Sequence, residues 1–173
     1  MSFFKNLFGD KGNSLDDNQK LDLDTLLASA DTNSTIIELD NYVCKLCRWG
    51  DNLDRLTEPQ KNFFFNQNLE REINNGGFNQ YFYNSSGNYA NETLTSLRAI
   101  GANKTADILR HAIDQFPSST APKDRQERQD VLEKIEGRAN EVWEQLDQKF
   151  FAYEDDLNEL NLQYVRQHRS SFA

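Results

Sequence analysis

Histidine, cysteine, proline and long apolar runs are scarce in this 173-residue chain, and each scarcity excludes a class of structure. With two histidines and two cysteines, a zinc site of about four ligands would need every one of them to converge. No apolar run approaches the ~20 residues of a membrane-spanning helix. The apolar part of the first 12 residues is too short for a secretory signal. We therefore expect a cytoplasmic protein without a membrane span.

Basic residues are also few: 19 Lys and Arg stand against 28 Asp and Glu, which gives a net charge of −9. Direct binding to nucleic-acid phosphates needs clustered Lys and Arg, so this balance argues against it. An acidic protein can instead bind a basic protein partner.

The cysteines form one Cys-x-x-Cys pair, Cys44 and Cys47, within a helical pattern rather than after a strand. We expect buried structural thiols, because a thioredoxin-like site needs a preceding strand. His111 and His168 stand in no catalytic motif, and the sequence contains no nucleophile elbow or phosphate-binding glycine loop. The sequence therefore predicts no enzyme, no metal and no cofactor.

From Ser34 onward the apolar residues recur at helical spacing, and no segment alternates with period two over strand length. This pattern predicts an all-α fold, a single compact domain of six to eight helices over residues 34–173. Residues 1–33 are expected to be a loosely attached extension and linker with short helical pieces, including an amphipathic turn at Phe3, Phe4, Leu7 and Phe8.

Residues 57–90 contain the clearest local signals. Thr57 and Gln60 form a capping box that begins a helix. Gly76 is expected to end that helix in the left-handed conformation. The segment 78–89 that follows is rich in aromatic and amide side chains. It could line a groove or form a helix junction whose amides satisfy backbone groups. We favour the junction, because no Lys or Arg lies between Arg71 and Arg98.

Farther along, Asn103 is expected to cap a helix, and the three acids 154–156 to complement the dipole of the last one. Between them, one long helix should run from about Asp124 past Gly137, with Val131, Ile135, Val142, Leu146 and Phe150 facing the core. At 100° per residue, six of its acids share an arc of about 140° that spans ~25 Å and contains neither Lys134 nor Arg138. We call this set the acidic arc: Asp130, Glu133, Glu136, Glu141, Glu144 and Asp147.

Several residues of the segment 72–84 carry a family resemblance. They are Glu72, Asn75, Gly76, Gly77, Phe78, Gln80, Tyr81, Phe82 and Asn84. With this Asn-Gly-Gly-Phe-x-Gln-Tyr-Phe block, the chain resembles a bacterial DNA-mimic protein family. The resemblance implies an all-α domain, a homodimer and no known catalytic chemistry. It also implies a mode of action in which surface carboxylates occupy the DNA-binding face of a transcription factor.

These observations lead to a functional hypothesis: a non-enzymatic module that binds a basic protein, such as a transcription regulator, as an acidic DNA mimic through the acidic arc. One alternative is a small-ligand-binding or catalytic helical domain that uses the aromatic and amide residues of 78–89. Another is an immunity protein that neutralises a toxin through the same acidic surface.

Overall fold

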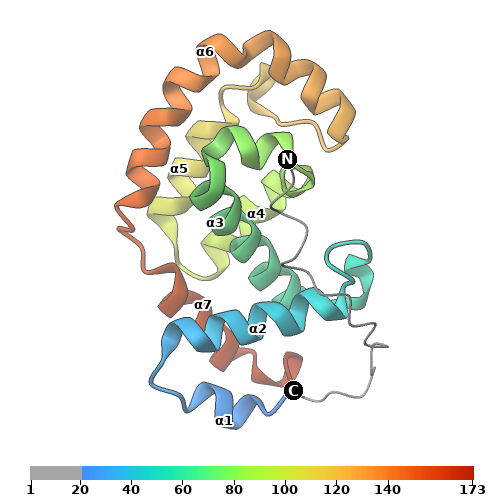
Figure 1. Cartoon of the computed structure of the whole chain (residues 1–173), viewed down its shortest axis with the longest axis vertical. Helices are drawn as coiled ribbons and strands as arrows, with labels where there is room; N and C mark the ends of the chain where they lie inside the picture. The colour runs from blue at the N-terminus through green and yellow to red at the C-terminus, as the bar shows by residue number, and fades with distance from the viewer. Residues whose placement is uncertain (1–20) are drawn as a thin grey trace, which may run out of the picture.

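The computed structural model describes residues 21–173, and all the regular elements in this range are helices, so the predicted all-α fold is confirmed (Figure 1). The predicted turn at residues 3–8 lies outside the described residues. No helix in the described range is both long and apolar enough to cross a membrane. The α-helices are α1 (Leu23–Leu27), α2 (Thr32–Leu46), α3 (Glu58–Tyr83), α4 (Ala90–Ala99), α5 (Asn103–Ile113), α6 (Arg125–Phe151) and α7 (Leu157–Gln167). Four 3₁₀ turns join or follow them: Leu53–Arg55, Ser85–Tyr89, Pro117–Ser119 and Arg169–Ser171.

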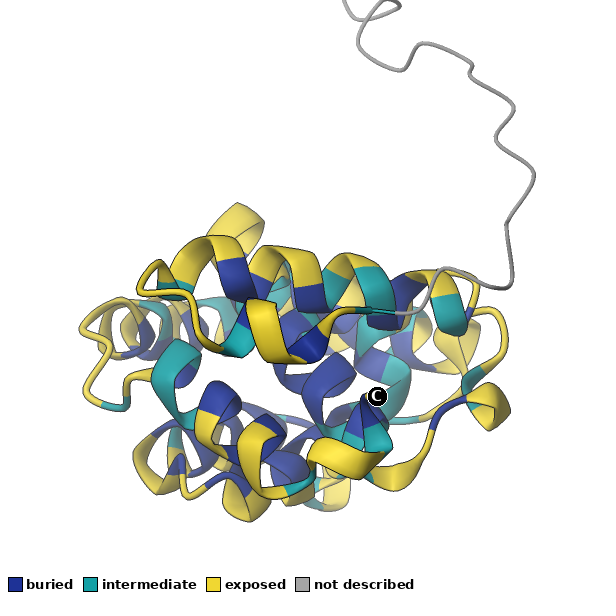
Figure 2. Cartoon of the chain, turned by 90° about the horizontal axis from the view of Figure 1, so that it is seen from below, coloured by how far each residue is buried: buried dark blue, intermediate teal, exposed yellow. Residues whose placement is uncertain are grey.

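Helix α3 runs through the middle of the molecule and contributes to two apolar clusters (Figure 1). Its first half, with Phe63, packs among α1, α2 and the C-terminal residues up to Phe172. Its second half, with Phe82, packs among α4, α5 and α6. Leu23 and Leu26 of α1 are buried in the first cluster, so this part of the expected extension packs on the domain. Figure 2 shows the buried residues on the inward faces of the helices.

Helix α6 continues through Gly137 as one helix, as predicted, but the residues that it buries are only partly those predicted. Leu132, Ala139 and Trp143 are buried, whereas Val131 and Val142 are only partly buried. The Trp143 indole N–H donates to the carbonyl of Ala112 at 3.1 Å. Contacts with α3 and α5 on two sides turn the face of α6 that carries Trp143 toward the core.

The helix caps are partly those predicted. Thr57 and Gln60 form the expected capping box. The prediction for Asn103 was wrong, because Asn103 is already inside α5 and the N-cap residue Ala102 has no side chain that can bond. Asp155 replaces it: its Oδ2 accepts from the backbone N–H of Thr105 at 2.8 Å. Of the acids 154–156, Asp156 accepts from the backbone N–H of Glu159 and caps α7.

Cys44 and Cys47 are both buried and free, which confirms the expected burial of the thiols. Burial raises the pKa of Cys44 to about 12. A thiol with such a pKa is almost entirely protonated at neutral pH and is therefore a poor nucleophile.

Candidate protein-interaction site at the glycine turn

Helix α3 breaks at Gly76 and Gly77, and the residue in the left-handed region is not the one predicted. Gly76 has φ −168°, an extended value that any residue adopts, whereas Gly77 has φ 70°. The chain also does not end its helix with a simple cap, because a second helical half, from Phe78 to Tyr83, follows at once. We call residues 76–77 the glycine turn.

Asp147 of α6 holds the second half of α3 in place. Its Oδ1 accepts the backbone N–H of Phe78 at 2.9 Å, and therefore caps a helix that begins 69 residues earlier in the chain. A Cβ at Gly77 would overlap the carboxylate of Asp147. Burial raises the pKa of Asp147, the hydrogen bond from Phe78 opposes this rise, and the charge of Glu144 adds to it. Asp147 therefore differs from the other five residues of the acidic arc, because its carboxylate holds the backbone of α3 in place.

Other motif residues gather around the carboxylate of Glu72. Its Oε2 accepts from the amides of Gln80 at 2.7 Å and Asn84 at 2.9 Å, and its Oε1 accepts from the hydroxyl of Ser86 at 2.9 Å. The structure therefore agrees with the helix junction favoured from the sequence. The amides differ from that expectation in one respect, since they bind a carboxylate rather than exposed backbone groups.

The aromatic residues of the motif belong to the core. Phe78, Tyr81 and Phe82 are fully buried, and the Tyr81 hydroxyl donates to Thr93 Oγ1 at 3.0 Å. Neither of the two surface depressions described below is lined by residues of 78–89. The binding groove considered for the segment 78–89, with Tyr81, Tyr83 and Asn84, is therefore neither of these two depressions.

Arg128 is a central residue that the sequence reasoning missed. It is fully buried, and its guanidinium donates to the carbonyls of Phe82 at 2.6 Å and Asn84 at 2.8 Å. It also donates to the carbonyls of Pro122 and Lys123 and to Asn88 Oδ1. Its spacing of four and seven residues from Leu132 and Ile135 places it on the buried stripe, and that spacing was the available signal.

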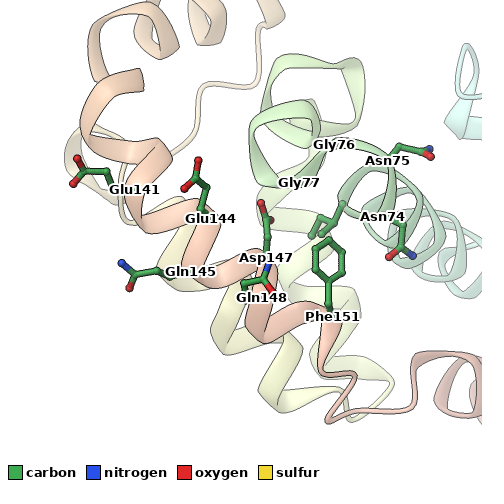
Figure 3. Close-up of a pocket in the computed structure, with 11 residues that line it drawn as sticks. Asn74, Asn75, Gly76, Gly77, Glu141, Glu144, Gln145, Asp147, Gln148 and Phe151 are labelled. Atoms are coloured by element: carbon green, nitrogen blue, oxygen red, sulfur yellow. The ribbon is translucent and has the colours of Figure 1, made fainter.

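An open groove lies between the glycine turn and α6, with a volume of about 800 Å³. Asn75, Gly76 and Gly77 line one side of it, and Glu141, Glu144 and Asp147 line the other. In Figure 3, Asp147 points toward the turn, Glu141 stands farther out, and the ring of Phe151 projects toward α3. Among residues 21–173, no Lys or Arg lines this glycine-turn groove. The structure thus brings together two sets of residues that the sequence analysis considered separately.

The rest of the acidic arc follows the outer side of α6. Asp130, Glu133 and Glu136 are exposed, as are Glu141 and Glu144 at the groove. None of the arc carboxylates forms an ion pair with a base in the described part of the chain. Within residues 21–173, no group of three or more His, Cys, Asp or Glu side chains is arranged to hold a metal ion. Within residues 21–173, the arc therefore contains five exposed carboxylates that form no ion pair with a Lys or Arg.

The model of the family described as DMP19-like protein matches residues 54–168, well over half of the chain. The chain belongs to the DMP19-like family. This is a DNA-mimic family. The matched residues 54–168 include both the glycine turn and the acidic arc. Neither the curated proteins nor the solved structures contain a match to the chain.

Two substitutions of Asp147 should separate its hydrogen bond from its charge. Asp147→Asn keeps an oxygen that accepts from Phe78, whereas Asp147→Ala removes the cap and should lower the free energy of unfolding by about 1–3 kcal/mol. In the wild type the folded pKa lies above the unfolded value, so the folded state binds the extra proton between the two. Stability from this group therefore falls as the pH rises through that window.

Asp147→Asn lacks this titration, so its stability relative to the wild type should increase as the pH rises from about 4, the ordinary aspartate range. Urea unfolding across this pH range measures the difference. A difference that does not change with pH would show that the charge of Asp147 is no less stable in the folded state than in the unfolded state.

Proposed function

We propose that this protein is a non-enzymatic interaction module that binds a basic protein surface, and that it acts as a DNA mimic toward a DNA-binding protein such as a transcription regulator. The observation that carries the proposal is the row of exposed carboxylates on α6, none of which forms an ion pair with another residue of 21–173. Membership of a DNA-mimic family supports the same role.

The spacing of the charges bears on how the mimicry works. The five exposed arc acids, from Asp130 to Glu144, extend over ~21 Å at a rise of 1.5 Å per residue. A DNA strand presents one phosphate per ~3.4 Å, and is therefore more densely charged than this helix. A second copy of the chain, as in the predicted homodimer, would add a second acidic face. We therefore propose that the homodimer is the binding unit.

The test removes charge from the arc without removing the Asp147 cap. The variant combines Glu133→Gln, Glu136→Gln, Glu141→Gln and Glu144→Gln, and it should fold normally because these side chains are exposed. The wild type is used to capture DNA-binding proteins from the native cytoplasm. Displacement of the captured protein from labelled duplex DNA is then followed by fluorescence anisotropy over a range of salt concentrations. The variant should compete about tenfold less well, with a weaker salt dependence.

A matched control removes the same number of charges elsewhere. Glu38, Asp51, Asp54 and Asp107 are exposed and lie outside α6, so their Gln and Asn variants change the net charge equally. This control should compete within about twofold of the wild type, because local charge governs the contact. Equal competition by both variants, with equal salt dependence, would remove the arc from the binding surface.

A further inference from the structure

A second depression lies beside the glycine-turn groove and shares Asn74 with it. Its volume is about 250 Å³, and its walls come from α2, α3 and the start of α7. We call it the amide pocket, after the four amide side chains in its lining: Asn41, Gln67, Asn74 and Asn158. Its charged residues are Asp40, Glu70 and Arg71.

Three residues of the amide pocket, Arg71, Asn74 and Asn158, already use side-chain donors within the protein. Arg71 pairs with Asp40 at 2.5 Å. The amide nitrogen of Asn74 donates to the Tyr153 hydroxyl at 2.7 Å, and that of Asn158 donates to Asn33 at 3.1 Å. The amide oxygens of Asn74 and Asn158 make no such bond to the described chain, so these two residues offer acceptors to the pocket.

Glu70 is the one charge in the pocket without a basic partner in residues 21–173. It accepts a hydrogen bond from the Tyr153 hydroxyl at 3.1 Å, and burial raises its pKa. Gln67, only 8 % exposed, lies beside Glu70, but its Nε2 has no hydrogen bond of acceptable geometry. Within the described residues, Glu70 therefore has no cation beside it, and Gln67 Nε2 has no well-aligned acceptor although Glu70 lies close.

Tyr153 connects the two depressions. Its hydroxyl contacts both Asn74 and Glu70, and its φ of 45° places it in the left-handed region, which is unfavourable for a tyrosine. Each depression also has one exposed apolar side chain in its wall, Ile37 in the amide pocket and Phe151 in the glycine-turn groove. Both depressions thus combine polar acceptors with one exposed apolar side chain.

We propose that these two depressions together bind one extended segment of a partner protein, with one basic side chain in each. In the amide pocket, an ammonium or guanidinium group pairs with Glu70, and a backbone carbonyl of the segment accepts from Gln67 after a small rotation of its amide. In the glycine-turn groove, the second cation lies between Glu144 and the ring of Phe151. The inference rests on the proposed interaction role and adds the form of the partner.

The chemistry of the groove favours a cation for three reasons. Carboxylate–guanidinium hydrogen bonds are stronger than neutral ones. A cation over an aromatic face is attracted by the ring quadrupole. The first half of α3 also ends at the groove, and a helix C-terminus carries partial negative charge.

The amide pocket is smaller than the ~300–1,000 Å³ of ordinary ligand sites, so it admits one side chain rather than a helix.

The experiment is calorimetric titration of the full chain with unstructured peptides. One series carries two arginines separated by two to six Gly or Ser residues, a second carries lysines, and a third carries alanines. At least one arginine peptide should bind tenfold or more tightly than its alanine counterpart. Glu70→Gln and Phe151→Ala should each weaken this binding about fivefold. Glu133→Gln with Glu136→Gln, on the outer side of α6, should change it less than twofold.

The outcomes separate this inference from the proposed function. The inference is overturned if arginine and alanine peptides bind alike, or if Glu70→Gln, Phe151→Ala and the outer-face variant lose affinity equally. It is also overturned if spermidine binds as tightly and displaces the peptide, which would indicate a polyamine site. Should no peptide bind while the arc variant still loses its DNA-binding partner, the proposed function stands and the inference fails. If an arginine peptide binds but the arc variant competes for the DNA-binding protein as well as the wild type does, the inference stands and the proposed function fails.

Discussion

Replacement of Arg128 by alanine is expected to lower the free energy of unfolding by about 3–5 kcal/mol, because it leaves several buried carbonyls without donors and opens a cavity. The guanidinium joins the end of α3, the following turn and the residues before α6 through five hydrogen bonds. Gly87 allows this close packing, since a Cβ there would approach the guanidinium and the backbone of Tyr81. Urea denaturation of the full chain measures the loss.

Arg125→Ala is the matched control for this change. Arg125 stands one turn earlier on the same helix, is exposed, and makes one hydrogen bond to the Tyr83 carbonyl at 3.2 Å. Its guanidinium lies 5.9 Å from the centre of the Tyr83 ring. Exposed contacts of this kind contribute less than ~1 kcal/mol. Similar losses for the two variants would mean that the buried network has no special importance.

Arg128→Lys should also be destabilising, which distinguishes hydrogen-bond geometry from charge. An ammonium has three donors on a flexible stem and cannot reproduce the planar fork of a guanidinium. At Arg128 the acceptors lie on three different segments, so one lysine cannot reach all of them.

Features that depend on neighbouring residues were predictable from the sequence. The capping box of Thr57 and Gln60 involves only four adjacent residues. The continuity of α6 through Gly137 follows from the helical period on both sides. These signals indicate the helical class of the fold because a helix makes its backbone hydrogen bonds within one segment.

Features that depend on distant residues were not predictable. Asp147 caps Phe78 and Asp155 caps Thr105, although local rules seek a cap just before each helix. The position of the left-handed glycine was one residue off: Gly77 has the positive φ, and Gly77 is also the glycine that packs against the carboxylate of the distant Asp147. Contacts between residues so far apart in the chain cannot be inferred from one sequence.

The candidate site was predicted only in part. The exposure of Asp130, Glu133, Glu136, Glu141 and Glu144 agrees with the helical arc. Asp147 differs because its edge of α6 faces the second half of α3, where Asn140 also bonds to Asn79 at 2.9 Å. The groove itself arises from the break in α3, and periodicity within one helix cannot show how two helices enclose a space.

Replacement of Gly77 by alanine is expected to lower the free energy of unfolding by about 2–4 kcal/mol. Two effects act together, since alanine is strained at a φ of 70° and its Cβ would overlap the carboxylate of Asp147. Displacement of that carboxylate would also remove the hydrogen bond to the Phe78 N–H. Thermal and urea unfolding measure the change.

The control is the same substitution at Gly137, which is exposed within α6 and has open space where the methyl group of an alanine would lie. Gly137→Ala should raise stability by about 0.5–1 kcal/mol, because alanine favours a helix interior. The double variant Gly77→Ala with Asp147→Ala removes the overlap but keeps the backbone strain, so its cost should be smaller than the sum of the single costs. Additive costs would show that the glycine is required for its φ alone, and that Asp147 does not determine the shape of the turn.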